Sequence, residues 1–354
     1  MIKTRGPFAF QRFVYSLRET GHDDLADILE GKRTVLSVDN IPNNEDDRDP
    51  DREIDTFFHN MQLADEPLRI RVKKSTEFLD GPIYKTVPRY PMRSNPRGLV
   101  LLITNIYYKY VDESPRISAE HDETNLTQLF QQMGFRVVSF RDLTGQDLLD
   151  KVKEFSQRED LRKVDSCFVI ISSHGSMNEK HEDTEIQGID YHPSAALDNY
   201  KTVLCMDIMD CFTAESCPRL AGKPKVFIFQ LCRGSKSQKS IKEPRHTTDT
   251  INIPAKTTTE IIDHRMNNKT TMRNYSDMLI AHATMPGHVA FRDKITGSWF
   301  IQILCEVFMN YANTTHIQDL FNIRTTKEEC QTLTLTMFGF NKHCYLNPGL
   351  FEET

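Results

Sequence analysis

The stretch Lys225-Val226-Phe227-Ile228-Phe229-Gln230-Leu231-Cys232-Arg233-Gly234 predicts a β-strand that ends in a group of reactive side chains. Residues Lys225–Leu231 are mostly apolar and do not alternate with polar ones, which is typical of a strand buried on both faces. Similar runs predict further buried strands at Leu99–Thr104, Arg136–Phe140, Cys167–Ser172 and Met278–Ala283.

Helical patterns lie between and after these runs. One helix face, between the first two strands, consists of Leu126, Leu129, Phe130 and Met133. The last predicted elements are helices near Trp299–Tyr311 and Ile317–Lys327 and a strand at Thr332–Phe338. Because strands that alternate with helices form parallel sheets covered on both sides, the sequence predicts an α/β fold with a mostly parallel central sheet flanked by helices.

The composition excludes several classes of protein. Of the 354 residues, 44 are basic and 50 are acidic, and the net charge of −6 argues against nucleic acid as the main partner. No apolar run approaches the ~18 residues of a membrane span, and the N-terminus lacks the apolar stretch of a signal peptide. The eight cysteines form no Cys-x-x-Cys pair, so we expect reduced thiols in the cytoplasm, without disulfides or a structural metal.

Two long segments differ from the strand–helix pattern. Residues 1–31 predict two short amphipathic helices, and residues 32–95 predict a flexible linker because they carry an acidic run between Glu45 and Asp55. Residues 235–274 contain eight threonines and eight basic residues with almost no apolar periodicity. A structureless stretch of this length inside a compact domain is either functional or disordered.

Two reactive side chains follow two of the predicted strands. Cys232 follows the strand that ends at Leu231, and His174 follows the strand that ends at Ser172. In a parallel sheet, strands present their carboxyl ends at one edge, so the thiol and the imidazole are expected there together. Each alone has an ordinary structural interpretation, as a core thiol or a hydrogen-bonded histidine. Together, at matching strand ends, they favour a nucleophile and its proton partner.

The residues around Cys232 resemble those of the caspase family. Gln230–Gly234 matches the signature Gln-Ala-Cys-[Arg/Gln/Gly]-Gly with one departure, Leu231 in place of alanine, and the signature's histidine also precedes the cysteine. Cys217–Lys225 resembles the family's segment before this strand, and Gly297–Gln302 resembles the start of its small-subunit helix. The resemblance covers Arg97 to the C-terminus and implies the three-layer caspase-like fold.

The resemblance implies cleavage of peptide bonds after aspartate. Three residues match the family's primary pocket: Arg116, Gln230 and Arg292. Guanidinium groups suit such a pocket because they return charge-assisted hydrogen bonds to a desolvated carboxylate. Ser118 stands where the family usually has glycine. Val289 and Phe291 resemble the apolar second pocket, where Phe291 replaces a frequent tryptophan and is expected to alter specificity.

The mechanism expected from the resemblance uses Cys232 as a thiolate nucleophile and His174 as the proton donor and base. The backbone N–H groups of Cys232 and Gly175 are expected to stabilise the tetrahedral oxyanion. This thiol chemistry requires no cofactor and no metal.

The same resemblance implies a zymogen. It divides the chain into a large subunit (96–234), an intersubunit linker (235–274) and a small subunit (275–354), with Asp80, Asp249 and Asp263 as candidate autoprocessing sites. Residues 1–31 resemble the last part of a caspase recruitment domain, which implies an initiator-like enzyme in apoptosis and a possible adaptor. A homodimer, with the last strand at its interface, is also expected.

Two alternatives belong to other classes. The first is a catalytically weak or inactive caspase-like regulator that binds an active caspase, which would normally lack the cysteine, the histidine or a pocket arginine. The second is a related peptidase with basic or asparagine specificity, which the pair Arg116 and Arg292 disfavours.

Overall fold

The structure is a computed structural model that describes Arg18 and residues 66–79, 88–110, 115–192, 201–239, 273–321 and 329–352. The two helices predicted within residues 1–31 lie outside the described residues apart from Arg18, as do Asp80, Asp249 and Asp263.

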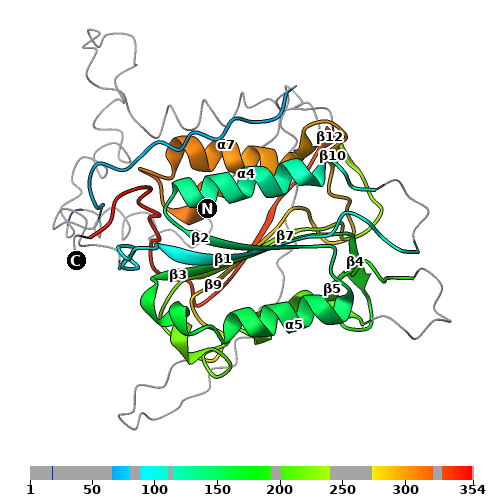
Figure 1. The fold of residues 1–354 in the computed structure, drawn as a ribbon, viewed down its shortest axis with the longest axis horizontal. Coiled ribbons are helices and arrows are strands. Elements are labelled where there is room, and N and C mark those ends of the chain that lie inside the picture. Colours follow the sequence, from blue (N-terminus) through cyan, green and yellow to red (C-terminus); the bar gives the residue numbers. More distant parts are fainter. Residues whose placement is uncertain are drawn as a thin grey trace, which may run out of the picture. The chain divides into compact units, whose positions relative to one another are not determined.

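A six-stranded sheet forms the centre of the fold (Figure 1). Its order is β13-β9-β7-β3-β1-β2, and β13 alone among these strands runs antiparallel to its neighbour. The strands are β1 (Gly98–Thr104), β2 (Arg136–Arg141), β3 (Ser166–Ser172), β7 (Lys225–Gln230), β9 (Met278–His282) and β13 (Thr334–Phe338). The predicted mostly parallel sheet is therefore confirmed.

One predicted strand differs in its burial. We predicted Arg136–Phe140 to be buried like the others, whereas β2 is an edge strand whose residues are partly or fully exposed. Among the described strands β2 pairs only with β1, so one of its two sides has no neighbouring strand to shield it from solvent. By contrast, every residue of β1, β3 and β7 is buried.

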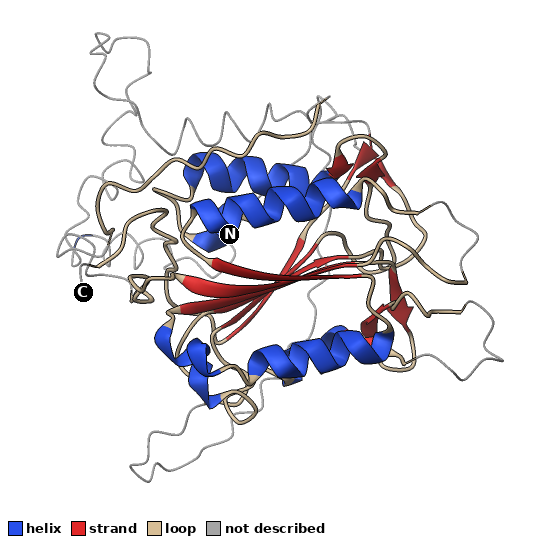
Figure 2. Cartoon of the chain, in the orientation of Figure 1, coloured by secondary structure: helices blue, strands red, loops and turns tan. Residues whose placement is uncertain are grey.

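Helices cover both faces of the sheet (Figure 2). The helices α4 (Ala119–Gln132) and α7 (Trp299–Tyr311) lie on one side, and α5 (Gly145–Ser156) lies on the other (Figure 1). In α4, the predicted apolar face is buried. The helix predicted over Ile317–Lys327 is described only as the short α8 (Ile317–Leu320). This arrangement confirms the flanking layers of the predicted fold.

Smaller elements surround these layers. They are η4 (Glu159–Lys163), β4 (Gly175–Asn178), β5 (Asp183–Ile186), β6 (Val203–Leu204), α6 (Cys205–Asp210), η5 (Pro218–Leu220), β8 (Gln238–Lys239), β10 (Arg292–Asp293), β11 (Gly297–Ser298) and β12 (Glu329–Cys330). Within the described residues, every helix is too short or too polar to span a bilayer.

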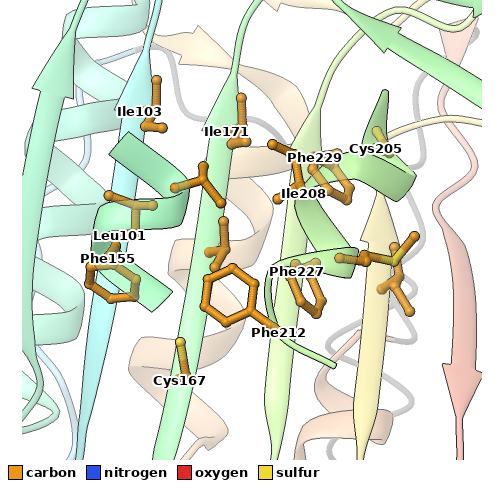
Figure 3. Close-up of a cluster of buried hydrophobic side chains, with 14 of the residues drawn as sticks. Leu101, Ile103, Phe155, Cys167, Ile171, Cys205, Ile208, Phe212, Phe227 and Phe229 are labelled. Atoms are coloured by element: carbon orange, nitrogen blue, oxygen red, sulfur yellow. The ribbon is translucent and has the colours of Figure 1, made fainter. Parts of the chain in front are cut away.

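One cluster of the apolar core lies between the sheet and α5 (Figure 3). Phe227 and Phe229, two residues apart on β7, point to the same face as Ile171 of β3 (Figure 3). The ring of Phe227 contacts that of Phe212 edge-on at 5.6 Å and stacks with that of Phe229 at 6.4 Å. Each fully buried side chain of this size contributes about 1.5–3 kcal/mol through removal of its surface from water. This burial fixes the strands whose ends carry the polar groups described below.

Part of the range predicted as linker packs onto this domain. Ile70, Val72 and Met92 are buried, and the backbone N–H of Lys73 donates to the carbonyl of Met309 at 2.8 Å. The packed domain therefore includes residues before Arg97.

His282 stays uncharged in the folded protein and makes stability depend on pH. The residue is 7% exposed, and its ring stacks on Phe229 with centroids 5.1 Å apart. Burial, and then the positive charge of Arg233, lower the pKa of His282 from 6.5 to about 3. The unfolded chain binds this proton at higher pH, so the stability contributed by neutral His282 is present above pH ~6.5 and is lost as pH falls toward ~3.

We expect His282→Phe to keep the ring packing and remove this dependence. Between about pH 7 and pH 4, wild type should lose roughly 3 kcal/mol more unfolding free energy than the variant. Urea unfolding at the two pH values measures the difference. His181→Gln, at an exposed histidine, should behave as wild type. Equal losses in wild type and His282→Phe would contradict the prediction.

Candidate active site

The two reactive motifs leave the sheet at neighbouring positions. Ser172 and Gln230, the last residues of β3 and β7, are paired in register. Ser173-His174 and Leu231-Cys232 therefore emerge side by side at the carboxyl edge, as the parallel topology predicts. Leu231 is 1% exposed and lies in the apolar core with Phe227 and Phe229. The core therefore accommodates leucine at the position where the caspase signature has alanine.

A cavity of about 230 Å³ opens at this edge. The residues that line it are Arg116, Ser173, His174, Gln230, Cys232, Ala290, Phe291 and Arg292. The thiol, the imidazole and all three predicted pocket residues thus surround one space. Val289 lies outside this lining, although its neighbours Ala290 and Phe291 belong to it.

Gly175 brings the histidine segment against the cysteine segment. A Cβ atom at Gly175 would lie 2.8 Å from the carbonyl oxygen of Glu185 and 3.0 Å from that of Cys232. Any larger residue would therefore push the backbone after His174 away from Cys232. The fold thus requires glycine at this position.

The thiol of Cys232 rests on the segment that follows β9. The backbone N–H of Ala290 donates to Cys232 Sγ at 3.4 Å. The next residue, Arg233, exchanges backbone hydrogen bonds with this segment, from its N–H to the His288 carbonyl (2.9 Å) and to its carbonyl from the Gly287 N–H (2.8 Å). Gly234 permits this approach, because a Cβ there would collide with the backbone of Gly287.

The two pocket guanidiniums are held from separate parts of the chain. Arg116 is 4% exposed and donates from Nη1 to the Asn105 carbonyl (2.5 Å) and from Nη2 to Ser172 Oγ (3.0 Å). Arg292 donates from Nη1 to Ser118 Oγ at 2.7 Å. Ser118 in turn donates to the carbonyl of Asp293 at 2.7 Å.

Gln230 is buried at the cavity and has unused hydrogen-bonding capacity. The residue is 3% exposed, and its Oε1 atom has no hydrogen-bond partner among the described residues. Buried side-chain amides are rarely left unsatisfied in folded proteins. Because Oε1 is an acceptor, a ligand or water that donates a hydrogen bond would satisfy it, whereas the amide nitrogen of Gln230 can donate to an acceptor in the same cavity.

The cavity has a positive electrostatic character. Burial, followed by the charges of Arg116 and Arg292, lowers the pKa of His174 from 6.5 to about 4. The imidazole is therefore neutral at pH 7 and able to accept a proton. Asp122 lies near both arginines, but burial raises its pKa to about 6, and it accepts hydrogen bonds from the Ser298 N–H (2.8 Å) and hydroxyl (2.6 Å). One carboxyl thus faces two guanidiniums, which leaves the cavity suited to an anionic side chain.

Two residues that the sequence analysis did not identify support the site. Gln331 accepts from the Phe291 N–H (2.7 Å) and donates to the Ala283 carbonyl (2.8 Å), so it ties the cavity wall to the end of β9. The ring of Tyr108 packs on that of His174, with centroids 4.6 Å apart. The sequence could have indicated Tyr108, because this residue follows β1 at the same sheet edge as Cys232 and His174. No sequence feature marks Gln331 as a site residue.

A thiol, a neutral imidazole and two guanidiniums around one cavity are the groups of a cysteine-dependent hydrolase that recognises an acidic substrate. The described residues contain no group of three or more His, Cys, Asp or Glu side chains arranged to hold a metal ion.

Comparison with known proteins agrees with this class. The caspase domain family matches residues 97–330. Caspase Dronc of Drosophila melanogaster is 30% identical over 99% of this chain and 83% of its own length, and caspase-2 of Gallus gallus is 26% identical over 90% and 74%. The crystal structure of the Drosophila initiator caspase Dronc superposes with a TM-score of 0.59 at 23% identity, covering 82% of this chain and 99% of the other. The chain belongs to the caspase family, as its motifs indicated, and thus to a family of cysteine proteases.

Proposed function

We propose that this protein is a cysteine endopeptidase that cleaves peptide bonds after aspartate and acts in apoptosis as an initiator-like caspase. The observation that carries the proposal is the single cavity lined by Cys232, His174, Arg116, Gln230 and Arg292. The similarity to caspase Dronc over 99% of the chain supports the initiator-like role, because the solved structure of Dronc is that of an initiator caspase.

The positive pocket supports aspartate as the residue before the cleaved bond. A carboxylate loses its hydration on entering the cavity and needs charge-assisted hydrogen bonds in return. Each guanidinium uses only part of its five N–H donors on the protein, so both retain donors for a ligand. Gln230 also lines the cavity, and its side-chain amide nitrogen is a further donor for the carboxylate.

The proposed reaction proceeds through an acyl-enzyme. His174 takes the proton of Cys232, and the thiolate attacks the carbonyl carbon to form a C–S bond. The N–H groups of Cys232 and Gly175 stabilise the oxyanion, and one such donor is typically worth about 3 kcal/mol. The protonated imidazole then gives its proton to the leaving amine as the C–N bond breaks. Finally, His174 activates water, which releases the acid and restores the thiol.

Fluorogenic peptides that differ only in the residue before the reporter test this function. We expect turnover of the peptide ending in Asp and no measurable turnover of matched peptides ending in Asn or Arg. Turnover of the Asn or Arg peptide at a comparable rate would overturn the specificity. Absence of all turnover, even after forced dimerisation, would favour the inactive regulator.

The proposal extends to activation. The polypeptide is a zymogen in which cleavage at Asp249 or Asp263 separates a large subunit (96–234) from a small one (275–354), and Asp80 is a further processing site. Mass spectrometry of the activated protein should find a new C-terminus at Asp249 or Asp263. A fully active protein with neither terminus would contradict this.

The proposed assembly is a cytoplasmic homodimer. In the described part of the sheet, β13 pairs only with β9, and its residue Met337 is 51% exposed, which supports β13 as the edge that a second copy contacts. Residues 1–31 provide the contact with an adaptor. Sedimentation of the full chain, with Met337→Lys as a variant, tests the dimer.

Ser118 is expected to strengthen substrate binding through Arg292. Ser118 is the N-cap residue of α4, but its hydroxyl makes no capping bond and instead accepts from Arg292. Ser118→Gly, which restores the residue usual in the family, should raise KM for Asp peptides about fivefold with little change in kcat, because glycine is tolerated at an N-cap and only the hydroxyl's two hydrogen bonds, from Arg292 and to the Asp293 carbonyl, are lost. Steady-state kinetics measure both constants, and Ser139→Ala, at a hydroxyl bonded to Glu123, is the matched control. An unchanged KM would refute the role.

A further inference from the structure

We propose that Tyr108 is a positioning residue for His174, fixing both its backbone and its ring in the Cys232–His174 pair. This inference deepens the proposed function and rests on it. Tyr108 itself lies outside the lining of the cavity, so it acts through the histidine.

The hydroxyl of Tyr108 belongs to a chain of hydrogen bonds with a defined direction. The backbone N–H of His174 donates to Tyr108 Oη at 2.8 Å, and Tyr108 Oη lies 2.7 Å from Ser173 Oγ. Ser173 Oγ donates its only proton to the Gln187 carbonyl at 2.6 Å. Tyr108 must therefore be the donor toward Ser173.

The same chain is anchored at a second point. Asn105 donates from Nδ2 to Ser173 Oγ at 3.1 Å and to the Gln187 carbonyl at 3.2 Å. The backbone carbonyl of Asn105 also accepts from Arg116. The segment after β1 thus holds a pocket arginine through Asn105 and the histidine through Tyr108, three residues later.

The Tyr108 ring restrains the imidazole as well. The two ring centroids are 4.6 Å apart at an interplanar angle of 56°, so the imidazole rests on the tyrosine instead of rotating freely. One side chain therefore constrains His174 at its backbone N–H and at its ring. Burial raises the pKa of Tyr108, which keeps the hydroxyl protonated and the direction of the chain unchanged.

This geometry predicts an effect on the chemical step without an effect on binding. Tyr108→Phe keeps the ring but removes the oxygen that accepts from His174, whereas Arg116, Gln230 and Arg292 keep all their contacts. A poorly oriented proton donor slows bond cleavage, since catalytic groups must be held within a fraction of an ångström.

The experiment compares Tyr108→Phe with Tyr107→Phe, a control at the neighbouring, 49% exposed tyrosine. With Asp peptides, we expect Tyr108→Phe to lower kcat about tenfold with KM within twofold of wild type, and Tyr107→Phe to match wild type. A kcat equal to wild type, or a loss confined to KM, would overturn the proposal. Melting temperatures of both variants must equal that of wild type, and a kcat loss in Tyr108→Phe that only follows a lowered melting temperature would overturn the proposal.

A second readout does not depend on peptide specificity. Alkylation of Cys232 by iodoacetamide, followed by peptide mass spectrometry across pH, reports how well His174 takes the thiol proton. We expect Tyr108→Phe to slow this alkylation at neutral pH severalfold, and an unchanged rate profile would overturn the positioning role. Wild type that alkylates normally but cleaves no Asp peptide would instead refute the proposed function.

Discussion

Cys232→Ala is expected to abolish peptide hydrolysis, with kcat lowered at least about a thousandfold. Among the residues that the structure describes, the substitution removes the one sulfur that lines the cavity, and with it the proposed acyl-enzyme. Arg116, Gln230 and Arg292 keep their contacts, so Asp peptides should still bind. Steady-state kinetics and binding of a labelled Asp peptide measure the two effects separately.

Cys211→Ala is the matched control. Cys211 is also partly exposed, but it lies after α6, where its thiol donates to the Asp207 carbonyl at 3.3 Å. This variant should hydrolyse peptides as wild type does. Residual turnover by Cys232→Ala above a few parts per thousand would show that another group supplies the nucleophile.

Arg116→Lys is expected to lower kcat/KM for Asp peptides at least about a hundredfold, although it keeps the positive charge. Lysine lacks the planar fork that binds a carboxylate with two parallel bonds. It also cannot reach the Asn105 carbonyl and Ser172 Oγ together, so buried partners lose their donors. Truncation of a buried, hydrogen-bonded charge typically costs about 2–5 kcal/mol, which corresponds to this range of rates.

The control for this prediction is Arg136→Lys on the edge strand β2. Arg136 has a side chain 57% exposed and a 3.4 Å contact with Asp160, so its replacement should change neither kinetics nor melting temperature. Thermal unfolding of Arg116→Lys separates a loss of pocket function from a loss of fold. Normal Asp specificity in a folded Arg116→Lys protein would remove Arg116 from the pocket.

The apolar runs of the sequence were sufficient to predict the sheet. β1, β3, β7 and β9 are buried on both faces, which produces continuous apolar segments that no other element explains. The helix α5 was missed, although Leu148, Val152 and Phe155 lie on its buried face at helical spacing. The edge position of β2 follows from the order of the strands in the sheet, which the residues of β2 alone do not reveal.

The candidate site was predictable only where short motifs carry it. Cys232 and His174 follow strands whose order fixes their meeting point, and Arg116 and Arg292 were assigned from family motifs. The bond from Arg292 to Ser118 joins residues 174 positions apart, and Gln331 supports Phe291 from 40 positions away. Such contacts depend on how distant loops pack against each other in the folded protein, and no local sequence pattern predicts them.

The pairing of β7 with β9 has a consequence for any cut made between them. Five residue pairs, from Lys225 with Met278 to Phe229 with His282, join these strands in the interior of the sheet. Backbone scission between residues 239 and 273 would leave that ladder and the surrounding core intact, so the two fragments would remain one particle. Proteolysis there would separate the polypeptide into two chains without dissociating the halves that build the cavity.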